Sequence, residues 1–207
     1  MKTKASKITL VVCVVAVLVI AVAILLIVFK GNSNEDSTDN ISYVEGSFII
    51  DYDDLRQVAG AANYVFVGKV VSKGETEDDQ TQMLPVTEYS IRVEKNIKGE
   101  LITDEDITVY KAGGISDVSG DLILYEGDCM PEAGNRYVFY AFGQPDGTLL
   151  ISGPVSNVLI DSSEAQEANA SDVYSENQEY LAALDAYENE IESDIVEPLT
   201  CEYDVNA

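Results

Sequence analysis

The sequence predicts a mainly β domain: a five-stranded barrel with a short helix before its first strand and an amphipathic helix after its last, preceded by one transmembrane helix. Three observations support this fold class. An apolar, uncharged run lies near the N-terminus. Segments rich in branched and aromatic residues then follow one another, separated by turns that contain Gly, Asn or Asp. In the last region apolar residues recur at three- and four-residue spacing, which is typical of an amphipathic helix.

The apolar run, residues 8–29, is predicted to be a membrane anchor. It holds no charged residue, and a helix of this length covers roughly 33 Å, enough for a hydrocarbon core of about 30 Å. Lysines lie in the preceding residues 1–7, whereas acids soon follow the run. By the positive-inside rule, the N-terminal tail is therefore cytoplasmic and the C-terminal domain extracellular. The alternative is a cleaved secretory signal, but the run is longer than a signal core and no small-residue cleavage site closes it.

The part of the chain after the anchor is predicted to have three segments. Residues 30–47 are polar, small and unpatterned, and are predicted to form a flexible stalk. Residues 48–160 carry the strand pattern and are predicted to fold as the barrel domain. Residues 161–207 form an acidic C-terminal segment, because the chain has no Lys or Arg after Arg136.

Alternating apolar and polar residues predict the barrel strands. In front of them, Asp53 or Asp54 is expected to cap a short helix. Residues 115–135 are predicted to be a loop with one short apolar piece, Leu122 to Tyr125. The five predicted strands span residues 64–71, 86–97, 107–111, 136–142 and 149–152, with 158–160 as an extension of the last. The strand at 136–142 is apolar on both faces, so it is expected to be central.

An amphipathic helix is predicted over residues 175–196 of the C-terminal segment. Ser175 and Gln178 have the spacing of a capping box at its start, and Pro198 lies beyond its end. The apolar stripe of this helix needs a partner, either the surface of its own domain or a second protein. The stripe consists of Tyr180, Leu184, Tyr187 and Ile191.

The composition excludes several functional classes. With 37 acidic and 12 basic residues the chain carries a net charge of −25, and a field of this sign repels nucleic acid. The chain has no His, so the common nucleophile–His arrangements and the commonest zinc ligand are missing. We therefore predict a non-enzymatic protein without a cofactor. The acidic field attracts cations or basic partners, although solubility explains the same charge.

Two cysteines, Cys129 and Cys201, lie outside the predicted anchor. In an oxidising compartment such a pair forms a disulfide that would tie the C-terminal segment to the barrel. Sequence alone does not show that the two thiols come within reach, so two free cysteines remain the alternative. The acidic neighbour of Cys129 disfavours a reactive thiolate.

Acidic clusters give the candidates for a metal site and for catalysis. Asp51, Asp53 and Asp54 place several hard oxygens within four positions, which suits Ca²⁺. The spacing of a calcium loop is absent, however, and helix capping already explains Asp53 or Asp54, so no metal site is predicted. Asp128 and Glu132 are the candidates for a carboxylate-based hydrolase, which would need a cleft with paired acids.

A succession of strand motifs carries a family resemblance: VFVGKV at 65–70, VEKNIKG at 93–99 and GNRYVFY at 134–140. It resembles the OB-like barrels of the tissue inhibitors of metalloproteinases, and it looks like the uncharacterised membrane-anchored surface proteins of Gram-positive bacteria. The resemblance covers roughly residues 52–160 and implies a fold, not an activity, because strands and turns carry it. The inhibitory mechanism does not carry over, since no cysteine stands near position 50 to present its amine to a protease zinc.

OB-like barrels often bind ligands on one face through aromatic side chains. Strand alternation places about half of the barrel tyrosines in the core and leaves the others for such a face. The tyrosines on or near predicted strands are Tyr64, Tyr89, Tyr110, Tyr125, Tyr137 and Tyr140. The negative charge leaves a peptide or a glycan as the expected ligand.

The sequence thus predicts a membrane-anchored extracellular binding or interaction module. Its expected partners are the membrane, through residues 8–29, and a surface protein, peptide or glycan. The first alternative is a regulator of a neighbouring membrane or surface protein, which would use the anchor or the C-terminal helix as its contact. The second is the carboxylate-based surface hydrolase.

Overall fold

The structure of this chain is a computed structural model that describes residues 40–160, 174, 176–194, 197 and 199–207. The predicted cytoplasmic tail and membrane anchor lie outside the described residues. None of the helices in the described ranges combines the length and the hydropathy that crossing a bilayer requires.

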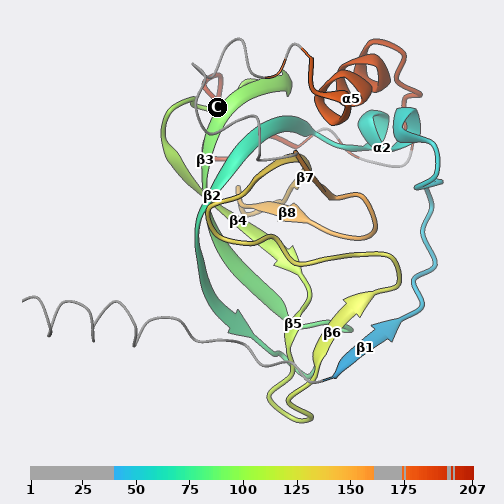
Figure 1. The fold of residues 1–207 in the computed structure, drawn as a ribbon, viewed down its shortest axis with the longest axis vertical. Helices are drawn as coiled ribbons and strands as arrows, with labels where there is room; N and C mark the ends of the chain where they lie inside the picture. The colour runs from blue at the N-terminus through green and yellow to red at the C-terminus, as the bar shows by residue number, and fades with distance from the viewer. Residues whose placement is uncertain (1–39, 161–173, 175, 195–196, 198) are drawn as a thin grey trace, which may run out of the picture. The chain divides into compact units, whose positions relative to one another are not determined.

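Within the described chain, five strands close into a barrel, as the sequence predicts (Figure 1). Around the barrel the order is β2-β3-β4-β8-β7, and β7 pairs back onto β2. Neighbouring strands are antiparallel except for β4 and β8, which are parallel. The bounds are Tyr64–Glu77 for β2, Val86–Lys98 for β3, Asp106–Ala112 for β4, Arg136–Gly143 for β7 and Leu149–Ile151 for β8.

In the part of the chain that the structure describes, two short helices cover the outside of the barrel next to β2 and β7. The predicted first helix is α2 (Leu55–Ala61), and its N-cap is Asp54, whose carboxylate accepts a hydrogen bond from the Arg56 amide. The second is α5 (Gln178–Glu188), which lies beside α2 at one end of the barrel (Figure 1). It is shorter than the predicted 175–196. Its N-cap is Asn177, and Ser175 lies outside the described residues.

The two faces of β2 and β7 build two separate hydrophobic cores. Phe66 of β2 and Phe139 of β7 point into the barrel and stack at 5.3 Å between ring centroids. Their neighbours Val65, Val67, Val138 and Tyr140 point outward and pack against α2 and α5. This explains why residues 136–142 are apolar on both faces: one face fills the barrel and the other carries the helices.

A small second sheet corrects two sequence predictions. Strand β1 (Ile41–Val44) pairs in parallel with β6 (Leu122–Tyr125), so the predicted flexible stalk is wrong over these residues. Strand β5 (Gly114–Ile115) completes this sheet, in which β6 is the apolar piece of the predicted loop. The stretch expected to extend the fifth strand is instead β9 (Asn157–Leu159), which pairs with β7.

The C-terminal residues 199–207 return to the barrel. Cys201 lies in the barrel core, and Leu101 and Asp204 form an isolated β-bridge. The Tyr64 hydroxyl donates to Asp204 at 2.8 Å and accepts from the Cys201 amide at 3.0 Å. The last residues of the chain are therefore part of the barrel domain.

Candidate ligand-binding groove

The strongest candidate site is a groove over Tyr110 on the outer face of β4. It has a volume of about 480 Å³ and lies between the end of the β2–β3 hairpin and the turn that joins β7 to β8. Its lining residues are Glu77, Gln82, Val86, Tyr110, Gln144, Pro145, Asp146, Thr148 and Leu150. A second hollow of about 340 Å³ shares Glu77, Val86 and Tyr110 with the groove. It adds Gly74, Glu75 and Glu88, and we call the two hollows together the Tyr110 groove.

Strand alternation places Tyr110 on this surface. Ile107 and Val109 point into the barrel, so the intervening side chain and Tyr110 point outward. The β7–β8 turn is held by its own hydrogen bonds: the Gly147 amide donates to the Gln144 carbonyl, and Asp146 accepts from the amide and the hydroxyl of Thr148. The groove therefore has a strand as its floor and a well-ordered turn as one wall.

The Tyr110 groove is acidic. Four carboxylates line it, from Glu75, Glu77, Glu88 and Asp146, and none of its described lining residues is basic. Desolvation raises the pKa of Tyr110, with further contributions from the charges of Glu88 and Glu77, so the phenol remains neutral. Hydrogen bonds from Thr148 lower the pKa of Asp146, which keeps that carboxylate ionised.

A neutral phenol ring surrounded by carboxylates is suited to binding a cation. The face of an aromatic ring attracts ammonium and guanidinium groups, and carboxylates accept their hydrogen bonds. The two hollows, of about 480 Å³ and about 340 Å³, adjoin at Glu77, Val86 and Tyr110, so together they have room for more than one side chain. Its chemistry therefore fits a segment that carries Lys or Arg side chains.

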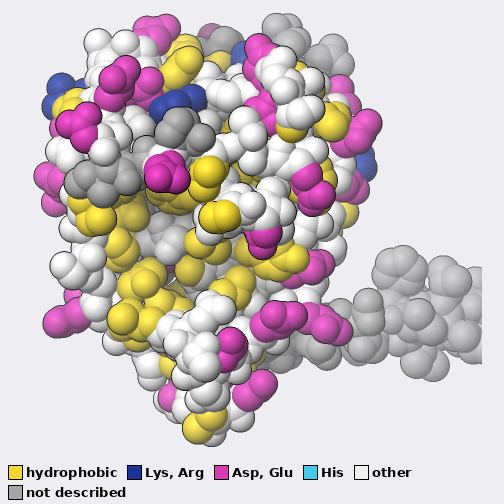
Figure 2. Space-filling view, turned by 180° about the vertical axis from the view of Figure 1, so that it is seen from behind, with side chains coloured by type: hydrophobic (Ala, Val, Ile, Leu, Met, Phe, Trp, Pro, Cys, Tyr) yellow, Lys and Arg dark blue, Asp and Glu magenta, His cyan; other side chains and the backbone are white. Residues whose placement is uncertain are grey.

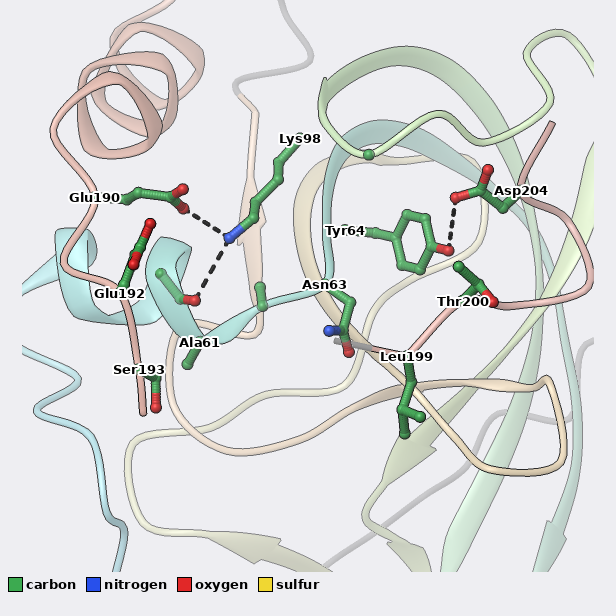
Figure 3. A pocket seen from close by; sticks show the side chains of 13 residues that line it. Ala61, Asn63, Tyr64, Lys98, Glu190, Glu192, Ser193, Leu199, Thr200 and Asp204 are labelled. Atoms are coloured by element: carbon green, nitrogen blue, oxygen red, sulfur yellow. Dashed lines mark hydrogen bonds and ion pairs between the residues drawn. The ribbon is translucent and has the colours of Figure 1, made fainter. Parts of the chain in front are cut away.

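A further pocket, of about 510 Å³, lies where the C-terminal residues meet α2 and the β3–β4 turn (Figure 3). Lys98 points to Glu190 and bonds it at 2.6 Å, and it also donates to the carbonyls of Ala59 and Gly60. Asn63 donates to the Glu197 carbonyl and accepts from the Gly143 amide. These hydrogen bonds join the C-terminal residues to the barrel, and the polar groups that make them already have partners.

The carboxylates of Asp51 and Asp54, two of the aspartates considered for a cation, make local hydrogen bonds instead. Asp54 caps α2 and pairs with Arg56 at 2.7 Å. Asp51 accepts a hydrogen bond from the Asp53 amide at 3.0 Å. In the described ranges of the chain no group of three or more side chains has the arrangement of a metal site.

The two cysteines are free thiols, so the disulfide considered from the sequence is not formed here. Cys201 is buried in the barrel core beside Tyr64. Cys129 is exposed on the segment between β6 and β7, where the Asn157 amide group approaches its sulfur at 3.3 Å. The two side chains thus have different surroundings.

The C-terminal helix packs on its own domain. Tyr180 is buried, Leu184 packs partly against the outer core, and Lys95 of β3 lies 5.0 Å above the Tyr180 ring. Tyr187 is half-buried, whereas Ile191 lies beyond the end of α5 and is exposed. The buried face of α5 consists of Tyr180, Ala183 and Ala186 and therefore differs from the predicted stripe.

The structure also contains a buried ion pair that the sequence reasoning missed. Lys111 Nζ lies 2.5 Å from Asp128 Oδ2, and the two side chains are 0% and 1% exposed. Lys111 lies on the same face of the strand as Ile107 and Val109, because these residues are two positions apart. This alternation indicates that the Lys111 side chain points inward. Glu132, the other acid considered for hydrolysis, is exposed and accepts a hydrogen bond from Asn135. The two acids are therefore not paired with each other, because Asp128 pairs with Lys111.

Acidic side chains are scattered over the molecular surface that Figure 2 shows. Figure 2 shows them spread over one face of the molecule, with few basic side chains and with apolar side chains gathered in a hollow across the middle.

A scan against protein-family models and a search of curated proteins found no match for this chain.

Proposed function

We propose that this protein is a membrane-anchored extracellular binding module that holds a basic peptide segment in the Tyr110 groove. The observation that carries the proposal is the composition of the groove: one outward-facing tyrosine, four carboxylates and no basic residue among those that line it. A ligand with Lys or Arg side chains complements both the ring and the charge.

The position of the groove supports a binding role. The barrel order β2-β3-β4-β8-β7, with a parallel β4–β8 pair, favours an OB-like barrel. In OB folds, the loops after the first and the fourth strand flank the ligand face. Here those loops are the β2–β3 and β7–β8 connections, which contribute Gln82 and Gln144 to the groove. The anchor is supported by the uncharged run at 8–29 and by the lysines that precede it.

A glycan is the alternative ligand, because tyrosine and carboxylates also bind sugar hydroxyls. The charge of the groove favours the peptide. The role as a regulator that contacts a partner through α5 has less support, since Tyr180, Ala183 and Ala186 of this helix are buried against its own domain. The hydrolase has less support too, since Asp128 is paired with Lys111.

The test measures binding of a short Lys- and Arg-containing peptide to the full chain in detergent. We expect Tyr110→Ala to weaken this binding about tenfold, which corresponds to about 1.4 kcal/mol of lost cation–ring and packing interaction. Tyr43→Ala is the matched control, because Tyr43 is an exposed tyrosine on β1 outside the groove. We expect it to leave the affinity unchanged.

The charge of the ligand is varied in the same assay. A peptide in which Glu replaces each basic residue should not bind, and a soluble oligosaccharide should bind more weakly than the basic peptide. Equal loss of affinity in Tyr43→Ala and Tyr110→Ala would contradict a site at the groove. Stronger binding of the oligosaccharide would replace the peptide by a glycan as the ligand.

A further inference from the structure

Lys111 and Asp128 form a buried pair outside the residues that line the Tyr110 groove. Lys111 lies on β4, and Asp128 lies on the segment that follows β6. The distance of 2.5 Å joins Lys111 Nζ and Asp128 Oδ2, and neither side chain is exposed by more than 1%. The amine nitrogen is therefore held against the carboxyl group in a site without bulk water.

The surroundings orient both reacting groups. The Ser156 hydroxyl accepts a hydrogen bond from Lys111 Nζ at 2.9 Å. The other oxygen of Asp128, Oδ1, accepts from the Cys129 amide at 2.7 Å, and the backbone of Gly153 also hydrogen-bonds this carboxyl group. The amine and the carboxyl group thus have separate partners that hold them in place.

The turn that carries Ser156 has an unusual backbone. Gly153 has φ 86° and Val155 has φ 56°, both in the left-handed region. Such a conformation is costly for a β-branched residue, and it persists where the surrounding structure fixes it. In this turn the Gly153 backbone hydrogen-bonds Asp128, and the Ser156 side chain hydrogen-bonds Lys111.

Burial also changes the protonation of the pair. Desolvation lowers the pKa of Lys111 and raises the pKa of Asp128, although the charge of each partner opposes these shifts. Two ions buried in a dry site are costly, and a proton transfer from the ammonium to the carboxylate gives a neutral amine and a carboxylic acid. The neutral amine has the free lone pair that a nucleophile needs.

We propose that Lys111 and Asp128 condense to an intramolecular amide cross-link. The lone pair of the neutral Nζ attacks Asp128 Cγ, and the carbonyl electrons move onto Oδ1, where the Cys129 amide stabilises the negative charge. The C–N bond forms, the C–Oδ2 bond breaks, and Oδ2 leaves as water with its own proton and one from Nζ. Nothing is oxidised or reduced, and one water is lost.

The cross-link would connect β4 covalently to the segment between β6 and β7. Lys111 is next to Tyr110, so the bond would also fix the strand that forms the floor of the groove. An amide in place of an ion pair removes two buried charges and restricts the unfolded chain, as a disulfide does. The cross-link follows from the geometry and the burial of the pair, and the ligand of the groove has no part in it.

The test is mass spectrometry of the full chain after complete denaturation. We expect an intact mass lower by one water, about 18 Da, than the mass of the sequence. After proteolysis, we expect one branched peptide that contains Lys111 and Asp128 and yields the fragment ions of both arms. Recovery of the two linear peptides, with Lys111 open to cleavage by trypsin, would overturn the proposal.

Two controls separate this bond from other losses of water. Lys98 and Glu190 form an ion pair of 2.6 Å, but their side chains are 20% and 25% exposed, so we expect no branched peptide there. Lys111→Met should have the full mass of its sequence. Persistence of the loss in Lys111→Met would assign it to another position, such as Asp146-Gly147, and would overturn the proposal. The digest of the unmodified chain decides the question even where this variant does not fold.

Discussion

Tyr140 is buried between β7 and the covering helices, and this environment determines its ionisation. Desolvation raises the pKa of Tyr140 to about 12 from an ordinary value of 10.0. Between these values the folded protein retains the phenolic proton that the unfolded chain has lost. The folded state thus binds more protons than the unfolded state, and the free energy of unfolding falls as the pH rises through this window.

The Tyr140→Phe variant tests this linkage. In the unmodified protein, the stability contribution of the Tyr140 phenol is fully present below pH 10 and is lost by about pH 12, with a slope of about 1.4 kcal/mol per pH unit for one proton. We therefore expect urea unfolding at several pH values to show a shallower alkaline decline for Tyr140→Phe than for the unmodified protein. Tyr43→Phe, at an exposed position, is the control. Parallel declines in all three proteins would contradict the prediction.

Single residues show where sequence reasoning stops. The inward direction of Lys111 could be read from its alternation with Ile107 and Val109. Its partner could not, because Asp128 lies on a loop whose path depends on the pairing of β6 with β1 and β5. The free state of Cys129 and Cys201 is unpredictable for the same reason: tertiary structure decides which side chains come within reach.

Small residues lie where α5 and the segment that follows it pack on the domain. Ala183 is completely buried on α5, whereas its neighbour Ala182 is exposed on the same helix. Gly60 of α2 has no room for a side chain, since an added Cβ would lie 1.9 Å from the Ile191 carbonyl oxygen. Gly60 of α2 and the backbone of Ile191, which lies beyond α5, therefore approach each other more closely than a larger residue at position 60 would permit.

We expect Ala183→Leu to destabilise the domain by about 1–3 kcal/mol, because the larger side chain overpacks the contact of α5 with the outer core. Ala182→Leu makes the same change in helix propensity at an exposed position and should be within about 0.5 kcal/mol of the unmodified protein. Urea unfolding followed by circular dichroism measures both. Equal stability of the two variants would show that α5 does not pack as described.

Elements with strong periodicity could be predicted from the sequence. The five barrel strands and α2 were predicted because branched, aromatic and capping residues mark them. Strand β1 was missed because Ile41 and Val44 stand among polar residues, and its pairing with β6 overrides that composition. The outward face of Tyr110 followed from alternation, whereas the groove around it needed the positions of two distant connections.

The C-terminal residues connect separate parts of the barrel domain. Glu202 donates its amide to Gly147, and Val205 donates its amide to Glu100, so the last segment bonds two separate turns of the barrel. Cys201 fills the barrel core between them. Apolar residues alternate with polar ones over 199–207, which is a strand-like signal, but the pattern does not show which turns of the barrel the segment contacts.

The net charge of −25 also acts on the molecule as a whole. Like charges lie closer together in the folded domain than in the unfolded chain, so repulsion lowers stability, and salt screens it. The Debye length falls from about 30 Å at 0.01 M to about 3 Å at 1 M. We expect the midpoint of urea unfolding to rise between about 0.01 M and about 0.5 M NaCl, with most of the rise below about 0.15 M. Sucrose at the same osmolality is the control for general exclusion effects. A midpoint that falls with salt would mean that the ion pairs, such as Arg136 with Glu94, outweigh the repulsion among the acids.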